Sequence, residues 1–270
     1  MKKNGSTIIL ILIFLTGLSL LLYPTVSDYW NSFHQTRAIA SYEETVATLD
    51  EEEYEEIWAE AVAYNKKLLT QPNRWNPTSE EIEAYESLLN VAGNGIMGYV
   101  EIPSISCTLP IYHGTDEAVL QIAIGHMEGS SLPVGGESTH CVISGHRGLP
   151  SAKLFTKLDE LVEGDVFMLQ VLGETLTYEV DQIRIVEPRE IDALEIVEGE
   201  DYCTLVTCTP YGVNSHRLLV RGHRVENREG KDVRIAADAR QIEPEIVAPL
   251  VAVPILFVLL IWLLVKYRKK

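Results

Sequence analysis

The residue best suited to covalent chemistry is Cys208, at the end of the apolar run 202–208 (YCTLVTC). Strand alternation places Cys208 on one face with Thr204 and Val206, and a loop-forming stretch, 209–215 (TPYGVNS), follows at once. A thiolate is a strong nucleophile, but a free thiol with a pKa of about 8.5 is mostly protonated near neutrality. Cys208 therefore needs a neighbouring group that favours the thiolate.

Arg217 is the candidate partner for this thiol. It lies near the start of the next predicted strand, 216–225. If the two strands pair through the intervening loop, Arg217 lies near Cys208 at the same end of the sheet. A guanidinium there favours the thiolate and stabilises the oxyanion that develops when a peptide carbonyl is attacked. By residue type alone, Arg217 is equally compatible with an ordinary ion pair on a strand face.

A proton donor for the leaving amine is the third requirement, and the chain has seven histidines. His146 is the best placed, because it follows the hydrophobic run 139–144 and is flanked by Gly145 and Gly148, which leave space for the ring. Four other histidines are candidates for surface or core positions: His34, His140, His216 and His223.

These residues require β-structure to position them. From Ile96 onward, short runs rich in Val, Ile, Thr and Tyr alternate with Gly and Pro clusters, which is typical of a barrel or sandwich. The clearest predicted strands are residues 98–102, 139–144, 165–172, 175–186, 202–208 and 216–225. Residues 118–124 and 152–161 are predicted to form short helices on the barrel.

The segment before the strands is predicted to be helical. Apolar residues recur at three- and four-residue spacing from 36 to 69. Two capping-box patterns predict helix starts, at Asp50 with Glu53 and at Thr78 with Glu81. The second of these helices is expected to reach about Asn90. The proline-bracketed loop 71–77 (QPNRWNP) separates the helices.

Both ends of the chain are apolar. Residues 7–23 and 246–265 carry no charge, and each approaches the roughly 20 apolar residues that span a bilayer. Lys and Arg flank both runs at the extreme termini, which predicts that both termini are cytoplasmic and that the segment between the spans is extracellular. The first run is also compatible with a cleaved signal peptide, with Ala38-Ile39-Ala40 as the cleavage site, and the second with a buried core helix.

The predicted organisation follows from these patterns. It comprises a cytoplasmic N-terminus and anchor at 1–28, a helical extension at 29–94, a catalytic barrel at 95–226, a charged stalk at 227–245, a second span at 246–265 and a basic cytoplasmic tail at 266–270. Apart from the terminal Lys and Arg, the chain has 16 cations against 39 acids, a formal charge of −23. Nucleic acid is therefore excluded as a partner. This charge provides solubility or attracts Lys-rich protein substrates.

The other three cysteines are Cys107, Cys141 and Cys203. In an exported chain, four cysteines in principle allow two disulfides. A domain of this size buries an adequate core without them, so the three are expected to be small buried apolar residues in strands. No Cys or His spacing indicates a zinc site, and the chemistry requires neither a metal nor a cofactor.

Several motifs, taken in order, resemble the sortase family. Residues 204–208 (TLVTC) resemble its Thr-Leu-x-Thr-Cys signature, Arg217 matches its catalytic arginine, and residues 144–146 (SGH) match its catalytic histidine. Three further stretches also fall in family order: 98–103 (GYVEIP), 132–136 (LPVGG) and 161–165 (LVEGD). The resemblance covers roughly residues 95–226, and ordered motifs are far more specific than any single one.

The resemblance implies a mostly β fold, a closed barrel of about eight strands with short helices, an N-terminal helical extension and flanking transmembrane helices. It also implies acyl transfer at an LPxTG-like sorting signal, cleaved between Thr and Gly. Cys208 would be the nucleophile, His146 the general acid and base, and Arg217 the group that orients the peptide and stabilises the oxyanion.

The second apolar run and the helical extension resemble class C sortases, which join pilin subunits through a lysine amine. Those enzymes carry a lid with an Asp-Pro-aromatic motif. Here the loop 71–77 places Trp75 at the aromatic position and Asn73 at that of the acid. A neutral Asn73 would hold Arg217 less firmly, so the lid would open more readily. Trp75 is also compatible with a hydrophobic staple between two helices.

Three other functions compete with this interpretation. A housekeeping sortase would use a peptidoglycan-precursor amine as acceptor, and a cysteine protease would use water. A membrane-tethered adhesion or scaffold domain would carry an inert thiol at Cys208. Under the first interpretation, the expected partners are the cell membrane and pilin proteins with a sorting signal and an acceptor lysine.

Overall fold

The computed structural model describes residues 5–227 and 244–268. Contacts divide the chain into two units: residues 1–31, 150–152 and 237–270 form the first, and residues 32–149 and 153–236 form the second. The predicted stalk, 227–245, and the basic residues nearest the two termini lie almost entirely outside the described residues.

The first unit contains apolar helix. It includes the beginning of α1 (Gly5–Val46) and all of α5 (Pro244–Arg268). Among the described residues, one helix is long and apolar enough to cross a membrane, within Ile8–Val46, where the most apolar window has a mean hydropathy of 2.3. The apolar stretch of α5, Ala252–Trp262, is shorter. By length and composition, the N-terminal span is therefore better supported than the second.

Helix α1 differs from the sequence prediction. We expected an apolar run to residue 23 and a separate helix from residue 36, whereas α1 is continuous from Gly5 to Val46 with Pro24 inside it. A proline inside a helix removes one backbone donor, and this helix continues on both sides of that gap. The residues between the two predicted segments therefore belong to one helix.

Helices α2 (Glu51–Leu68) and α3 (Ser79–Ser87) belong to the second unit. Both predicted capping boxes are formed, with reciprocal side-chain and backbone hydrogen bonds at the two helix starts. Helix α3 ends at Ser87, before Asn90, because Leu88 is extended and Leu89 adopts a left-handed backbone conformation with φ of 58°. A leucine in this region cannot continue a right-handed helix.

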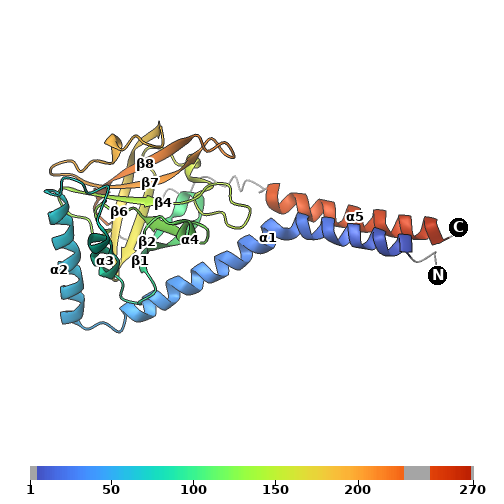
Figure 1. Ribbon diagram of the computed structural model, residues 1–270, viewed down its shortest axis with the longest axis horizontal. Helices are drawn as coiled ribbons and strands as arrows, with labels where there is room; N and C mark the ends of the chain where they lie inside the picture. Colours follow the sequence, from blue (N-terminus) through green and yellow to red (C-terminus); the bar gives the residue numbers. More distant parts are fainter. Residues whose placement is uncertain (1–4, 228–243, 269–270) are drawn as a thin grey trace. The chain divides into compact units, whose positions relative to one another are not determined.

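Eight strands close into a barrel in the order β1-β2-β3-β4-β7-β8-β6-β5, as the sequence resemblance predicted (Figure 1). Their bounds are β1 Ile96–Ile102, β2 Cys107–His113, β3 Ile124–His126, β4 Thr139–Ser144, β5 Val166–Val171, β6 Glu174–Val186, β7 Asp201–Thr209 and β8 His216–Val225. Strands β2 and β3 were not predicted. The first contains Pro110, and the second has only three residues.

Two predicted helices are corrected by the structure. Of residues 118–124, only the single turn α4 (Glu117–Leu120) is helical, and β3 begins at Ile124. Of residues 152–161, only the 3₁₀ turn η2 (Leu158–Glu160) is helical. Leu154 has φ of 38°, which is incompatible with a right-handed helix, and it is buried. The apolar residues of 152–161 therefore reflect burial against other parts of the barrel and not one face of a helix.

The helices of the second unit are anchored to the barrel by buried polar groups. The Tyr42 hydroxyl at the end of α1 donates to the Met97 carbonyl (3.1 Å) and accepts from the Leu172 amide (2.9 Å). In α2, the Asn65 side chain bonds both backbone groups of Leu132 (2.7 and 3.1 Å). These bonds attach the end of α1 and the later part of α2 to the barrel, and α2 and α3 lie at one side of it (Figure 1).

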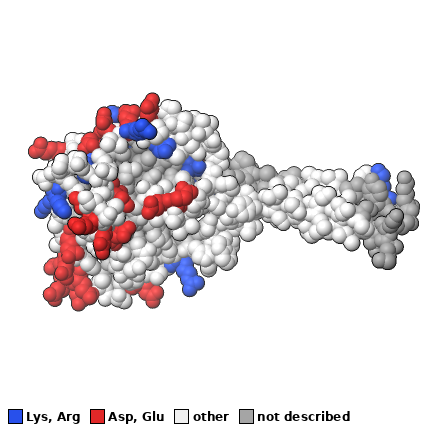
Figure 2. Space-filling model, viewed as in Figure 1, with Lys and Arg blue, Asp and Glu red and all other residues white. Residues whose placement is uncertain are grey.

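The surface of this unit is acidic. Figure 2 shows Asp and Glu side chains gathered over the side that carries α2, with fewer Lys and Arg among them. The first turn of α2 alone contributes Glu51, Glu52 and Glu53, which also favour the positive end of the helix dipole.

Candidate active site

The site is built on the pairing of β7 with β8. Cys208 is directly opposite Arg217 in this antiparallel ladder, as the sequence predicted. Side chains in such a pair point to the same face, with Cβ atoms about 5 Å apart. Both residues are partly exposed at the end of their strands. The thiol and the guanidinium therefore share one accessible edge of the barrel.

Strand β4 brings His146 to the same edge. Strand β4 runs parallel to β7, and its last pair is Ser144 with Val206. Beyond the ladder, the Gly145 amide donates to the Val206 carbonyl (3.0 Å), and the Thr207 hydroxyl donates to the Gly145 carbonyl (2.7 Å). Val206 and Thr207 immediately precede Cys208. The end of β4, which His146 follows, therefore lies beside the end of β7 that carries Cys208.

Glycine is required immediately before this histidine. A Cβ atom on Gly145 would lie 2.7 Å from side-chain atoms of both Ile124 and Phe155. The Phe155 amide donates to the His146 carbonyl (3.1 Å), which fixes the backbone on the other side. The glycine therefore permits tight packing beneath His146, a role different from the ring space that the sequence suggested.

The side chain of His146 is partly buried, and a carboxylate lies near it. Nε2 lies 3.7 Å from Oε2 of Glu117, on the short helix α4. Nothing in a local sequence pattern links α4 with the end of β4, so Glu117 was not among the predicted site residues.

Arg217 is held by its own strand and loop. Its Nη1 donates to the backbone carbonyls of His216 (3.1 Å) and Asn214 (3.4 Å). Asn73 makes a turn in which its backbone carbonyl accepts from the Asn76 amide (2.9 Å). The orientation of Arg217 thus comes from backbone carbonyls beside it.

The loop 71–77 covers the strand face that carries the candidate residues. Trp75 packs against a buried apolar cluster formed by Val142, Val186, Leu194, Val206 and Leu219. Val206 pairs with Leu219, two residues before the Cys208–Arg217 pair along the same ladder. Side chains two residues apart in a strand share a face. Trp75 therefore packs on the same face of the sheet as Cys208 and Arg217, against the neighbouring pair Val206 and Leu219.

The loop between β6 and β7 holds the loop 71–77 in place. The Arg74 guanidinium, only 7% exposed, pairs with Oε2 of Glu195 (2.6 Å), and the Trp75 indole donates to Oε1 of the same carboxylate (3.1 Å). Burial opposes ionisation of Glu195, but the hydrogen bonds from Arg74 and Trp75 hold its pKa below the usual value. Arg74 also donates to the Gly129 carbonyl (3.1 Å). We call this Arg74–Trp75–Glu195 contact the latch.

The latch was not found from the sequence. Arg74 and Glu195 are 121 residues apart, and each on its own resembles an ordinary surface charge. The backbone at Gly129 indicates how closely the loop 71–77 approaches the barrel, because a Cβ atom there would lie 2.0 Å from the Arg74 carbonyl. Only glycine permits this close approach of the two backbones.

His140 is a structural residue, one of the two roles that the sequence left open. It is 1% exposed, and its Nδ1 donates to the Glu195 carbonyl (2.9 Å) while Nε2 accepts from the Thr204 hydroxyl (2.7 Å). Burial lowers the pKa of His140 to about 4, so the ring is neutral near pH 7. His140 thereby supports the backbone of Glu195, whose side chain takes part in the latch.

The cysteines follow the prediction in part. Cys141 and Cys203 are buried and lie opposite each other in β4 and β7, and all four cysteines are free thiols. Cys107, in contrast, is only half-buried at the first position of β2. The first residue of a strand is less enclosed than the residues at its centre.

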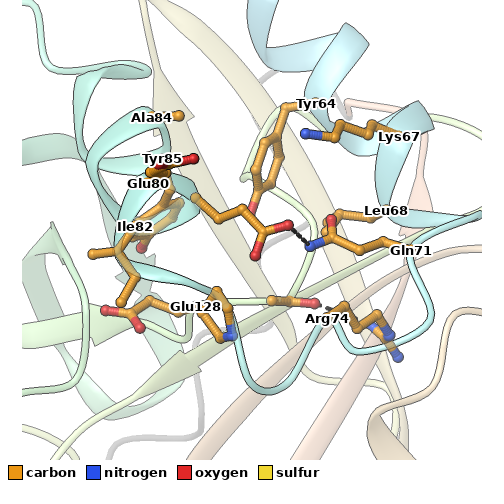
Figure 3. Close-up of a pocket in the computed structure, with 13 residues that line it drawn as sticks. Tyr64, Lys67, Leu68, Gln71, Arg74, Glu80, Ile82, Ala84, Tyr85 and Glu128 are labelled. Atoms are coloured by element: carbon orange, nitrogen blue, oxygen red, sulfur yellow. Dashed lines mark hydrogen bonds between the residues drawn. The ribbon is translucent and has the colours of Figure 1, made fainter.

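A pocket of about 240 Å³ lies behind the loop, between the end of α2, helix α3 and residues 128–129 (Figure 3). Within it, the Gln71 amide donates to a Glu81 carboxylate oxygen (2.7 Å), the dashed line of Figure 3. Its lining includes Arg74 but none of Cys208, His146 and Arg217. The pocket is therefore separate from the edge that carries the thiol.

Comparison with known proteins agrees with the geometry. The sortase domain family model matches residues 100–225. A solved sortase C1 from Streptococcus agalactiae is 56% identical, covering 71% of this chain and all of the other, with a TM-score of 0.69. A sortase C from Streptococcus pneumoniae is 49% identical, covering 71% of this chain and 97% of the other, with a TM-score of 0.65.

Among curated relatives, sortase D of Bacillus subtilis (strain 168) is 32% identical over 131 residues, which is 47% of this chain and 63% of the relative. The match thus spans less than two thirds of that protein. The solved structures, in contrast, are matched over nearly their whole length, and they carry the same fold at high identity. The chain belongs to the sortase family, and its structural neighbours are class C sortases.

Proposed function

We propose that this chain is a membrane-anchored cysteine transpeptidase that cleaves LPxTG-like sorting signals between Thr and Gly and joins the acyl group to a lysine amine of another pilin subunit. The observation that carries the proposal is the direct pairing of Cys208 with Arg217, at the end of the sheet where His146 leaves β4. A nucleophile, a fixed cation and a proton carrier at one edge are the groups that acyl transfer requires.

In the first half of the reaction, the Cys208 thiolate attacks the Thr carbonyl of the sorting signal. The Arg217 guanidinium orients the peptide and stabilises the oxyanion, since its position opposite Cys208 places positive charge beside the reacting carbonyl. His146 protonates the departing glycine amine, the C–N bond breaks, and a thioacyl enzyme remains.

In the second half, the incoming amine attacks the thioacyl carbonyl. His146 accepts a proton from this amine, and Cys208 leaves as the thiolate. The products are a new amide bond and the enzyme in its starting protonation state. Water as acceptor would give hydrolysis by the same steps, so the choice of acceptor depends on access to the thioacyl enzyme.

A pilin lysine is favoured as acceptor by the class C character of the structural neighbours. The similar Streptococcus pneumoniae sortase C is described with reference to pilin substrate specificity. The sequence resemblance to class C sortases rests on the helical extension with its loop 71–77 and on the second apolar run, which forms α5. They support the pilin lysine over a peptidoglycan-precursor amine.

We propose that the loop 71–77 is a lid. The packing of Trp75 beside Val206 and Leu219 supports this role, because a sorting-signal peptide has to reach the same strand face. The latch holds the lid, and a neutral Asn73 does not restrain Arg217. Lid opening would then be governed by Glu195 instead of by an acid at position 73.

We also propose two membrane spans, with both termini cytoplasmic and the barrel extracellular. The apolar window of α1 supports the first span, and the shorter apolar stretch of α5, with Trp262 near its end, supports the second.

The function is tested by Cys208→Ala in a reconstituted assay with purified pilin subunits. We expect no thioacyl enzyme and no polymer, while the matched control Cys107→Ala polymerises pilin like the wild type. Undiminished polymerisation by Cys208→Ala would refute the mechanism. If the wild type only hydrolyses the signal, and added lysine amines leave the product unchanged, the chain is a protease.

A further inference from the structure

The Nε2 atom of His146 is buried, and it has no hydrogen-bond partner among the described residues. Oε2 of Glu117 lies 3.7 Å from it. This distance is too long for a hydrogen bond but well within the range in which a carboxylate stabilises an imidazolium. A small rotation of either side chain would close the gap.

Glu117 is itself oriented by a neighbour. The Gln121 amide Nε2 donates to Oε1 of Glu117, one helical turn away. One carboxylate oxygen is therefore taken by Gln121, and the other faces His146. A base that is oriented by a carboxylate, which is in turn held by a third group, is the arrangement found where a histidine exchanges protons with a nucleophile.

The fold places α4 at this position. Helix α4 leads directly into β3, whose ladder with β4 pairs Gly125 with Ser144. The start of β3 therefore lies beside the end of β4 from which His146 emerges. Glu117 lies on the helix that leads into β3, and His146 follows β4, so the pairing of these two strands brings the two residues together.

We propose that Glu117 is a positioning residue for His146. It keeps the Nε2 proton in place and stabilises the imidazolium, which leaves Nδ1 to exchange protons with the amines. In the first half of the reaction, Nδ1 gives its proton to the departing glycine amine and the ring becomes neutral. In the second half, Nδ1 takes a proton from the incoming lysine amine. Glu117 takes no part in these proton transfers, and the inference rests on the role of His146 proposed above.

The magnitude of the effect is limited by solvent. The Glu117 side chain is 72% exposed, whereas that of His146 is 26% exposed. Water and salt screen an exposed carboxylate, so its influence on the imidazolium amounts to a several-fold change in rate. A deeply buried carboxylate in the same place would matter far more.

The experiment measures the pH dependence of kcat and kcat/KM of the full chain in detergent, with a fluorogenic sorting-signal peptide. In Glu117→Gln, the side chain keeps its size but loses its charge. We expect kcat to fall by about three- to tenfold with little change in KM. The limb of the pH profile that depends on the protonated ring should move to lower pH, since the imidazolium loses a neighbouring negative charge. Glu117→Asp should restore part of both effects.

Other ionisable groups at this edge stay the same in the variant: Cys208 on β7, Arg217 on β8, and Arg147, which pairs with Asp159. The matched control is Asp116→Asn, because it makes the same charge change one residue away and the Asp116 side chain forms no capping bond. We expect a wild-type pH profile for this control.

A wild-type pH profile in Glu117→Gln would overturn the inference, whatever happens to kcat. An equal shift in Asp116→Asn would also overturn it, because the effect would then be general electrostatics. His146→Ala separates the two proposals. If that variant retains wild-type activity, the proposed mechanism fails; if it is inactive while Glu117→Gln is unperturbed, only the role of Glu117 fails.

Discussion

Single residues at this barrel edge acquire their roles from the partners that surround them. His140 lies near the start of β4, has both ring nitrogens bonded and is fully enclosed. His146 follows the end of the same strand, and its Nε2 has no hydrogen-bond partner among the described residues. A ring with both nitrogens occupied cannot exchange protons with a substrate, so of these two histidines His146 is the one that remains available.

The enclosed His140 predicts a pH dependence of stability. Its pKa of about 4 in the folded state lies below the usual value of 6.5, so the unfolded chain binds the proton more readily. Stability is complete above pH 6.5 and is lost as the pH falls towards 4. We expect a loss of about 2 to 3 kcal/mol between pH 7 and pH 4.5, measured by urea unfolding.

The control for this prediction is His140→Gln, whose amide can donate to the Glu195 carbonyl and accept from Thr204 without titrating. Its unfolding free energy should change much less between the two pH values. His216→Gln alters an exposed histidine and should keep the wild-type dependence. If His140→Gln loses as much stability as the wild type, another group governs the acid sensitivity.

At the scale of elements, the latch joins the α2–α3 loop to the loop between β6 and β7. One carboxylate, Glu195, receives both the Arg74 guanidinium and the Trp75 indole, and His140 holds the backbone beneath it. The two loops are therefore bonded to each other. If the loop 71–77 is a lid, as proposed above, access to the strand face of Cys208 depends on both loops.

Loss of the latch should expose the thiol. We expect Glu195→Gln to raise the rate of Cys208 labelling by a membrane-impermeant alkylating reagent about three- to tenfold, since a charge-assisted bond to Arg74 contributes about 1 kcal/mol or more. Trp75→Ala should raise it further by removing the cover itself. Mass spectrometry of the labelled peptide identifies the site.

Glu198→Gln is the matched control for the latch, because Glu198 is an exposed acid in the same loop. Its labelling rate should equal that of the wild type. Unchanged labelling in both Glu195→Gln and Trp75→Ala would mean that Trp75 is a packing residue and that the loop is not a lid.

On the scale of the whole molecule, the chain combines an acidic unit that contains the barrel with apolar helix at both ends. The apolar window of α1 satisfies the length and composition of a span, and among the described residues the apolar stretch of α5, Ala252–Trp262, is shorter. Lys and Arg follow or precede the two apolar runs at the extreme termini.

The proposed topology predicts that epitope tags at both termini are protected from external protease in intact protoplasts, because the Lys and Arg clusters retain them in the cytoplasm. Immunoblotting after proteolysis checks this, with permeabilised protoplasts as the control in which both tags are digested. Digestion of the C-terminal tag alone in intact protoplasts would leave α1 as the sole span.

Much of this protein was predictable from the sequence, because local patterns carry the information. Strand alternation and the ordered motifs predicted the barrel and the pairing of Cys208 with Arg217, and the two capping boxes were read from four residues. The capping boxes depend on residues within a few positions of one another, and the Cys208–Arg217 pair depends on one hairpin. The three-residue strand β3 and the buried turns after β4 were missed, since their burial comes from distant segments.

Only the tertiary structure decided which groups surround the site. The latch between Arg74 and Glu195 and the approach of Glu117 to His146 each join parts of the chain that no periodicity connects. Barrel closure brings these elements together, and packing selects the side chains that meet. The sequence thus determined the strands that carry Cys208, His146 and Arg217, whereas the closed barrel determined what covers them and what holds them in place.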